Sequence, residues 1–223
     1  MWQRVIDSFS DKYDAFAWLG GASPLDVDLK IQEVSDDESP HYLVFDVETN
    51  GGGKYGQLVV QLAFIVFTKG HVELFRFNRL VKLLDGAKMN WFAQKIHGIS
   101  MDRLNSHGIE AHEALDEFIC WCARVDRVVA HNAHFDVGAI ENTCAQHCID
   151  FTIPINKVFC TMRESYKFTD FRNRKGRKKM AKNTELFEYF YGPPPVDLQL
   201  HDALNDVLLT AMAFRGGSNE NWW

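Results

Sequence analysis

The chain has 223 residues, of which 46% are hydrophobic and 24% charged, and its formal net charge is -6. This composition is typical of one soluble globular domain with a sizeable core, and the overall charge does not indicate a nucleic-acid binder. The apolar runs fall short of the roughly 20 residues of a membrane-spanning helix, and the N-terminus lacks a signal peptide's apolar centre. We therefore expect an intracellular protein, in the cytoplasm or nucleus, with no membrane partner.

Residues 1–39 are predicted to form an N-terminal helix and a linker. Apolar residues between positions 2 and 18 recur at helical spacing, which predicts an amphipathic helix. Its apolar stripe either packs on its own domain or binds a protein partner. The stretches "GGASP" and "SDDESP" that follow indicate a turn-rich, acidic connection.

The main domain is predicted at residues 40–216, and it begins with three apolar runs. Strands are expected at 41–47, 58–67 and 72–77. The second and third are separated by the short turn "TKGH", which predicts an antiparallel hairpin. The glycine-rich turn after the first strand is not a phosphate-binding loop, because Tyr55 follows Lys54 where that motif requires Ser or Thr.

Helices and strands alternate in the rest of the domain. Helices are expected at 90–98, 109–124, 135–147, 183–192 and 201–214, and strands at 127–132 and 155–161. Antiparallel strands followed by this alternation predict an α/β fold with a mixed sheet flanked by helices. Residues 217–223, which end in "NENWW", are expected to be a C-terminal tail, either a docking peptide for a protein partner or a frayed end.

Four acidic residues and one histidine stand near the ends of these elements. Asp46 and Glu48 alternate along the end of the first strand, so both project from the same side of the sheet. Adjacent carboxylates repel unless a cation lies between them, and clustered carboxylate oxygens select hard divalent ions such as Mg²⁺. Asp136 lies in the first turn of the helix after the fourth strand, and His201 and Asp206 lie at the start of the last helix.

These residues belong to three motifs: D-x-E at 46–48, H-N-x-x-F-D at 131–136 and H-x-x-x-x-D at 201–206. In this order and rough spacing the chain resembles the DEDDh family of 3′→5′ exonucleases. That family includes the proofreading subunits of bacterial DNA polymerases, ribonuclease T, oligoribonuclease and the three-prime repair exonucleases. The segment "QKIHGISMDRL" is similar to the family's H-G-I segment. The resemblance implies a ribonuclease-H-like mixed sheet whose first three strands are antiparallel and whose later strands are parallel.

The resemblance also implies a mechanism with two Mg²⁺ or Mn²⁺ ions. Asp46, Glu48 and Asp206 would hold one ion directly, Asp46 would also face the second, and Asp136 would act through bound water. His201 would be the general base, because an imidazole can take a proton from the attacking water at neutral pH. The implied activity is hydrolysis of phosphodiester bonds at the 3′ end of single-stranded DNA or RNA, with release of nucleoside 5′-monophosphates.

Three other residues compete for these roles. Asp202 is an alternative acid, but the family pattern counts five residues from the histidine and therefore selects Asp206. His131 and His134 are alternative bases; we interpret His131 as structural and His134 as exposed.

By analogy with the family, the last nucleotide would be surrounded by two backbone segments and four side chains. The backbone groups are those of Val47 and Thr49, and the side chains are those of Ile96, His97, Asn132 and Phe135. Core packing is the alternative interpretation for Ile96 and Phe135.

A basic stretch, "RNRKGRKKMAK" at residues 172–182, lies between the second and third motifs. It is either a solvated, mobile loop or an arm that binds the phosphates of the incoming strand with salt-dependent affinity. In the second interpretation the substrate-binding cations are Lys175, Arg177, Lys178 and Lys179.

Two other functions remain open for this sequence. One is a non-catalytic module on a nuclease-like fold, which binds nucleic acid or protein, and the other is an endonuclease. The complete set of acids and His201 favour the exonuclease, because a binder of a polyanion has no need for four clustered anions.

Overall fold

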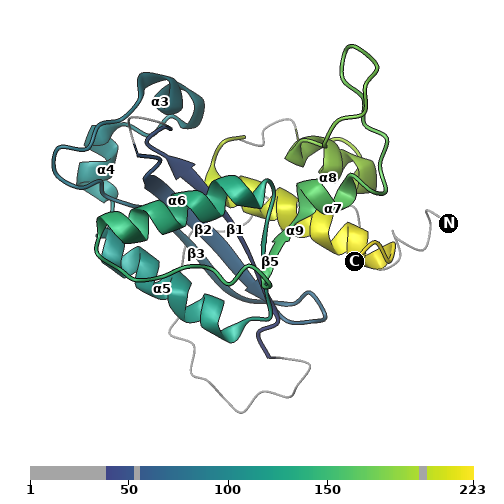
Figure 1. Ribbon diagram of the computed structural model, residues 1–223, viewed down its shortest axis with the longest axis horizontal. Helices are drawn as coiled ribbons and strands as arrows, with labels where there is room; N and C mark the ends of the chain where they lie inside the picture. Colours follow the sequence, from purple (N-terminus) through teal and green to yellow (C-terminus); the bar gives the residue numbers. More distant parts are fainter. Residues whose placement is uncertain (1–38, 53–55, 196–199) are drawn as a thin grey trace.

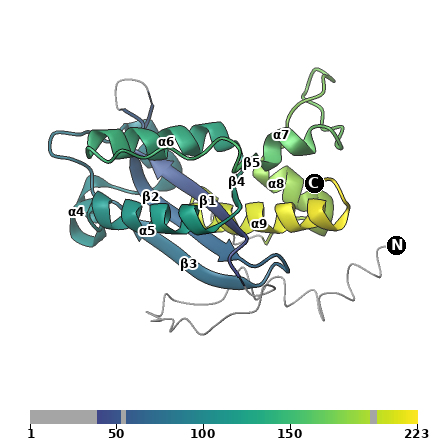
Figure 2. The ribbon, with the colours of Figure 1, turned by 60° about the horizontal axis from the view of Figure 1, so that its bottom comes forward.

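The computed structural model describes residues 39–52, 56–195 and 200–223 of the chain. The helix predicted at 2–18 and most of the acidic linker lie outside these residues. A twisted sheet forms the centre of the described part, and helices cover both of its faces (Figure 1, Figure 2). None of the helices in the described ranges combines the length and the apolar character needed to cross a membrane.

The sheet has five strands in the order β3-β2-β1-β4-β5. They are β1 (Tyr42–Thr49), β2 (Val59–Phe67), β3 (Glu73–Leu80), β4 (Arg127–Ala130) and β5 (Val158–Cys160). β2 pairs antiparallel with both β1 and β3, whereas β4 runs parallel to β1 and β5 runs parallel to β4. The predicted mixed sheet, antiparallel in its first three strands and parallel afterwards, is therefore confirmed.

The described helices are α3 (Trp91–His97), α4 (Met101–His107), α5 (Ala111–Arg124), α6 (Ala133–Gln146), α7 (Thr161–Ser165), α8 (Asn183–Tyr191) and α9 (Ala203–Asn219). The sequence did not predict α4 or α7. These helices have only 7 and 5 residues, and two turns or fewer are too short to show an apolar periodicity.

Successive side chains of β1 alternate between two separate hydrophobic cores. Leu43, Phe45 and Val47 are buried against residues of α5 and α6. Tyr42 and Val44 point the other way and are buried against α9. Because side chains alternate along a strand, Asp46 and Glu48 continue the row of Tyr42 and Val44 and lie on the face that α9 covers.

The C-terminal residues pack on the domain. The predicted boundary between domain and tail, after residue 216, falls inside α9. Trp222 stacks on Phe168 with 5.0 Å between the ring centroids, and Trp223 Nε1 donates a hydrogen bond to the Phe214 carbonyl oxygen at 3.0 Å. Gly217 makes this approach possible, because a Cβ at that position would lie 1.9 Å from a carbon of the Trp223 ring.

Candidate active site

The structure brings all five predicted catalytic residues to one pocket of about 420 Å³. Asp46 and Glu48 come from the end of β1, Asp136 from the first turn of α6, and His201 and Asp206 from the start of α9. The three motifs are far apart in the chain. They meet because α6 follows β4, the parallel neighbour of β1, while α9 packs on the face that Asp46 and Glu48 share.

Asp136 is held close to β1 by its carboxylate. Its side chain is only 3% exposed, and its Oδ1 accepts a hydrogen bond from the backbone N–H of Val47 at 3.3 Å. The contact joins the helix after β4 to the strand residue between Asp46 and Glu48. It therefore fixes the second motif against the first.

The start of α9 places His201 and Asp206 next to Glu48. One ligand atom from each of Glu48, His201 and Asp206 lies within 4.8 Å of the others. The His201 backbone N–H donates to Asp206 Oδ2 at 3.1 Å, and His201 adopts a left-handed conformation with φ 61°. A non-glycine residue in this region is strained by about 1 kcal/mol or more, and such residues cluster at functional sites.

The acids of the pocket raise one another's pKa. Burial raises the pKa of Asp46 well above its usual range, and repulsion from Asp136, Asp206 and Glu48 adds to this effect. Burial followed by repulsion from Asp206 and Asp136 raises the pKa of Glu48 to about 8. Burial also raises the pKa of Asp136 to about 8, against the opposing hydrogen bond from Val47.

Opposing effects also act on the pKa of Asp206. Burial raises its pKa, while the positive charge and the backbone hydrogen bond of His201 act in the opposite direction. Divalent cations would offset both the burial and the mutual repulsion of these carboxylates. The clustered carboxylate oxygens of the pocket therefore fit a hard divalent metal.

The predicted substrate contacts also line the pocket, and they are Val47, Thr49, Ile96, His97, Asn132 and Phe135. Ile96 and Phe135 are 42% and 41% exposed, so core packing does not account for them. His97 is buried, accepts a hydrogen bond from the Ile99 N–H on Nδ1 at 3.0 Å and donates from Nε2 to the Thr49 carbonyl at 3.2 Å. It thereby ties α3 to the end of β1.

The competing residues have other contacts. Both ring nitrogens of His131 are engaged, with Thr161 Oγ1 at 3.0 Å and the Ala181 carbonyl at 3.1 Å, and burial lowers its pKa to about 4. His134 is exposed and is not among the pocket-lining residues. Asp202 caps α9 by accepting hydrogen bonds from the N–H groups of Leu204 and Asn205.

Two polar residues that support the site were not singled out from the sequence. Asn183 Nδ2 donates to the backbone carbonyl of Asp206 at 2.9 Å, and nothing in the local sequence signals this contact. Gln61 lies directly opposite Glu48 in the β1–β2 register and donates to Asp202 Oδ2 at 3.1 Å. A glutamine inside the otherwise apolar run of β2 was a readable signal for a buried polar contact.

The basic residues of 172–182 lie outside the pocket. Lys179 forms an ion pair with Glu185, and the Lys178 ammonium lies 4.4 Å from the centroid of the Tyr166 ring. Lys175 and Arg177 are exposed. The four predicted cations therefore have different surroundings.

Comparison with known proteins points to one family. The profile of the RNase_T family, described as Exonuclease, matches residues 43–214. The 3′-5′ exonuclease DinG of Bacillus subtilis (strain 168) is 27% identical over 139 residues, which are 58% of this chain and 14% of that protein.

Solved structures with the same fold include two of E. coli Exonuclease I. The complex with a dA16 oligonucleotide has a TM-score of 0.67 at 16% identity, and covers 80% of this chain and 40% of that one. The zinc-bound complex with single-stranded DNA has a TM-score of 0.67 at 15% identity, with 82% and 41% covered. At these identities the likeness shows the fold, and the chain spans less than half the length of these proteins.

Proposed function

Because the chain belongs to the exonuclease family, we propose that it hydrolyses phosphodiester bonds at the 3′ end of single-stranded DNA or RNA and releases nucleoside 5′-monophosphates. The observation that carries this proposal is the convergence of Asp46, Glu48, Asp136, Asp206 and His201 on one pocket. Four carboxylates in a half-enclosed site repel a phosphodiester unless cations are bound there, so the arrangement is suited to metal-dependent hydrolysis.

The residues that would hold two Mg²⁺ or Mn²⁺ ions are Asp46, Glu48 and Asp206, with Asp136 acting through water. When bound, a pair of divalent ions stabilises the charge on the attacking and leaving oxygens of an in-line phosphoryl displacement. Asp136 keeps its place through the Val47 N–H, and Asp206 through the His201 N–H and the Asn183 side chain. The carboxylates of Asp136 and Asp206 are thus oriented before substrate arrives.

His201 is the proposed general base. It is exposed at the start of α9, and its ring nitrogen lies within 4.8 Å of carboxylate oxygens of Glu48 and Asp206. An imidazole in this position can accept a proton from the attacking water. The other two candidate bases are less suitable, since both nitrogens of His131 are engaged and His134 lies outside the pocket lining.

Ile96 and Phe135 are proposed to contact the base of the terminal nucleotide. Both are large, half-exposed apolar side chains that line the acidic pocket. Stacking on such side chains holds unpaired bases without reading their sequence. Asn132, which begins α6 in a left-handed conformation with φ 66°, offers a polar contact in the same pocket.

A single-strand digestion assay tests this function. Oligodeoxynucleotides and oligoribonucleotides labelled at the 5′ end are incubated with Mg²⁺ or Mn²⁺, and the products are resolved by length. We expect stepwise shortening that stops with a chelator and is lost, by about 10²-fold or more, in Asp46→Asn and His201→Ala. The matched controls Asp150→Asn and His134→Ala change exposed residues outside the pocket lining and should retain activity.

The same assay separates the alternatives. Internal fragments would identify an endonuclease. Binding of the oligonucleotide without any metal-dependent shortening would leave a non-catalytic binding module.

A further inference from the structure

Residues 170–180, between α7 and α8, fold into a hairpin that projects from the domain (Figure 1). We call it the basic hairpin. Arg172 and Lys178 form its antiparallel bridge. At the tip, Asn173 Oδ1 accepts hydrogen bonds from the backbone N–H groups of Lys175 at 2.9 Å and Arg177 at 3.1 Å. The Asn173 side chain thus organises the turn through the backbone of Lys175 and Arg177 and leaves their side chains free of this role.

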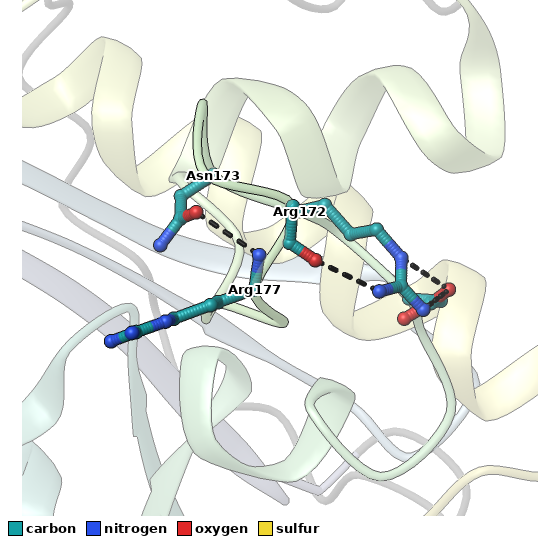
Figure 3. Close-up of polar contacts among 5 residues, drawn as sticks. Arg172, Asn173 and Arg177 are labelled. Atoms are coloured by element: carbon teal, nitrogen blue, oxygen red, sulfur yellow. Dashed lines mark hydrogen bonds and ion pairs between the residues drawn. The ribbon is translucent and has the colours of Figure 1, made fainter.

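The Arg172 side chain also stabilises the hairpin. Its guanidinium donates to Asp170 Oδ2 and to the Gly176 carbonyl oxygen, the latter at 2.9 Å (Figure 3). Gly176 has φ 74°, a left-handed conformation that glycine adopts without strain. Arg172 is therefore a structural residue of the hairpin, and its charge is paired with Asp170.

The other basic residues of the hairpin differ in whether they form an ion pair with an acidic residue. Lys179 is paired with Glu185 at the start of α8. Arg174, Lys175 and Arg177 are exposed, and none of them forms an ion pair with another residue in the described ranges. Lys178, whose ammonium lies on the Tyr166 ring, also has no ion pair within the described ranges, so four uncompensated positive charges extend from a protein whose formal net charge is -6.

Exposed apolar side chains surround the base of the hairpin. Phe168, Met180 and Tyr189 are 44%, 45% and 47% exposed. Trp222 supports two of them, with ring centroids 5.0 Å from Phe168 and 5.4 Å from Tyr189. Cations beside exposed rings bind single strands, because phosphates meet the cations while unpaired bases stack on the rings. A duplex hides its base faces and would leave these rings unused.

Two residues that follow the hairpin in the chain form hydrogen bonds with residues of the active-site pocket. Directly after Met180, the Ala181 carbonyl accepts a hydrogen bond from His131, which lines the pocket. Two residues further, Asn183 donates to the backbone of Asp206. A strand whose 3′ end lies in the pocket is therefore close to the hairpin and the rings at its base.

We propose that the basic hairpin, with Phe168, Met180 and Tyr189, is a second binding surface that holds single-stranded nucleic acid upstream of the 3′-terminal nucleotide. The proposal rests on the function proposed above, because that function places the 3′ end in the pocket. It predicts that affinity increases with length, since a trinucleotide fills the pocket while a longer strand also reaches the hairpin.

Binding without turnover tests this surface. The affinity for 5′-labelled single-stranded 3-mers and 20-mers is measured by fluorescence anisotropy with Mg²⁺ in a His201→Ala background, over a series of salt concentrations. The variant is Lys175→Gln/Arg177→Gln, which keeps the backbone groups that Asn173 binds. The control is Lys69→Gln/Arg103→Gln, which removes the same charge at two exposed positions in other elements.

We expect the hairpin variant to bind the 20-mer about tenfold more weakly at low salt and to lower the salt slope by about 1.4, or 0.7 for each lost phosphate contact. Binding of the 3-mer and the kcat on a saturating substrate should not change, and the control should behave as the parent. Equal 20-mer binding by parent and hairpin variant would overturn the proposal. So would an equal loss for a 20-base-pair duplex, which would show a surface for phosphates alone.

Because the His201→Ala background slows turnover by about 10²-fold or more, the result does not depend on catalysis. If the digestion assay shows no shortening but the hairpin variant still binds the 20-mer more weakly and the 3-mer unchanged, the proposed exonuclease function is refuted and the binding surface is supported. If the strand is shortened and the hairpin variant binds the 20-mer as the parent does, the binding surface is refuted and the exonuclease function is supported.

Discussion

Gln61 on β2 is the register partner of Glu48 on β1, and its side chain binds the start of α9. It lies directly opposite Glu48 in the strand register, and its Nε2 donates to Asp202 Oδ2 at 3.1 Å. Its Oε1 accepts a hydrogen bond from the Ala203 N–H at 3.3 Å. One buried side chain therefore holds the N-terminus of the helix that carries the third motif against β2, the neighbour of the strand that carries the first.

Replacing this amide should loosen the site. Gln61→Met keeps the volume but leaves Asp202 and the Ala203 N–H without this partner, which should lower the free energy of unfolding by about 1–3 kcal/mol. Displacement of the α9 start should reduce kcat more than it changes KM. Denaturant unfolding and steady-state kinetics measure both effects, and Gln146→Met on the exposed end of α6 is the control.

The stability of the metal-free protein should fall as the pH rises from about 6.5 to 8, above the range in which the lowered pKa of His131 acts in the opposite direction. The pKa of Glu48 is raised from its ordinary value of 4.5 to about 8, and that of Asp136 from 3.8 to about 8. Between these values the folded protein binds more protons than the unfolded chain, so raising the pH favours unfolding. Thermal unfolding in a chelator, followed across this range, measures the effect.

Divalent metal should reverse that trend. Bound Mg²⁺ or Mn²⁺ favours the ionised carboxylates and stabilises the folded state by mass action. Asp46→Asn removes one of the repelling charges, so it should raise the metal-free melting temperature near pH 8 while weakening the stabilisation by metal. A melting temperature in chelator that rises between pH 6.5 and 8 would show that the carboxylates do not repel one another in this way.

Truncation of Phe135 should weaken substrate binding more than it slows the reaction. The side chain is 41% exposed in the pocket, and stacking of one base on such a side chain contributes about 1–3 kcal/mol. Phe135→Ala should therefore raise KM about tenfold with a smaller change in kcat. Ile155→Ala, at an apolar position that is 85% exposed and outside the pocket lining, should leave both constants unchanged.

The packing of the C-terminus depends on Gly217. A Cβ at this position would overlap the Trp223 ring, with a shortest contact of 1.9 Å, so Gly217→Ala should lower the melting temperature and change the tryptophan fluorescence. Gly138→Ala in α6, where a Cβ meets no atom within 4 Å, should instead be neutral or stabilising. In a Trp223→Ala background the Gly217→Ala change should cost little, because the overlap is gone.

The motifs could be read from the sequence because their signals are local. Alternation along β1 predicted that Asp46 and Glu48 share one face. The predicted starts of two helices gave the positions of Asp136 and His201. The sheet was predictable for the same reason, since its apolar runs and short turns are contiguous in the chain.

The supporting contacts could not be read, because they join distant residues. Gln61 and Asp202 are separated by 141 positions, and Asn183 reaches Asp206 from another helix. The hairpin did have a local signal, because Asn173 and Gly176 occupy the first and fourth positions that turns favour. The dense positive charge around them indicated a loop or an arm, and did not show that Lys179 would pair with Glu185.

Divalent cations are expected in the pocket formed by the four acids. Anomalous diffraction from crystals grown with Mn²⁺ locates such ions. Manganese peaks should be bounded by the carboxylates of Asp46, Glu48 and Asp206. Crystals in which these side chains converge without any manganese between them would contradict this expectation.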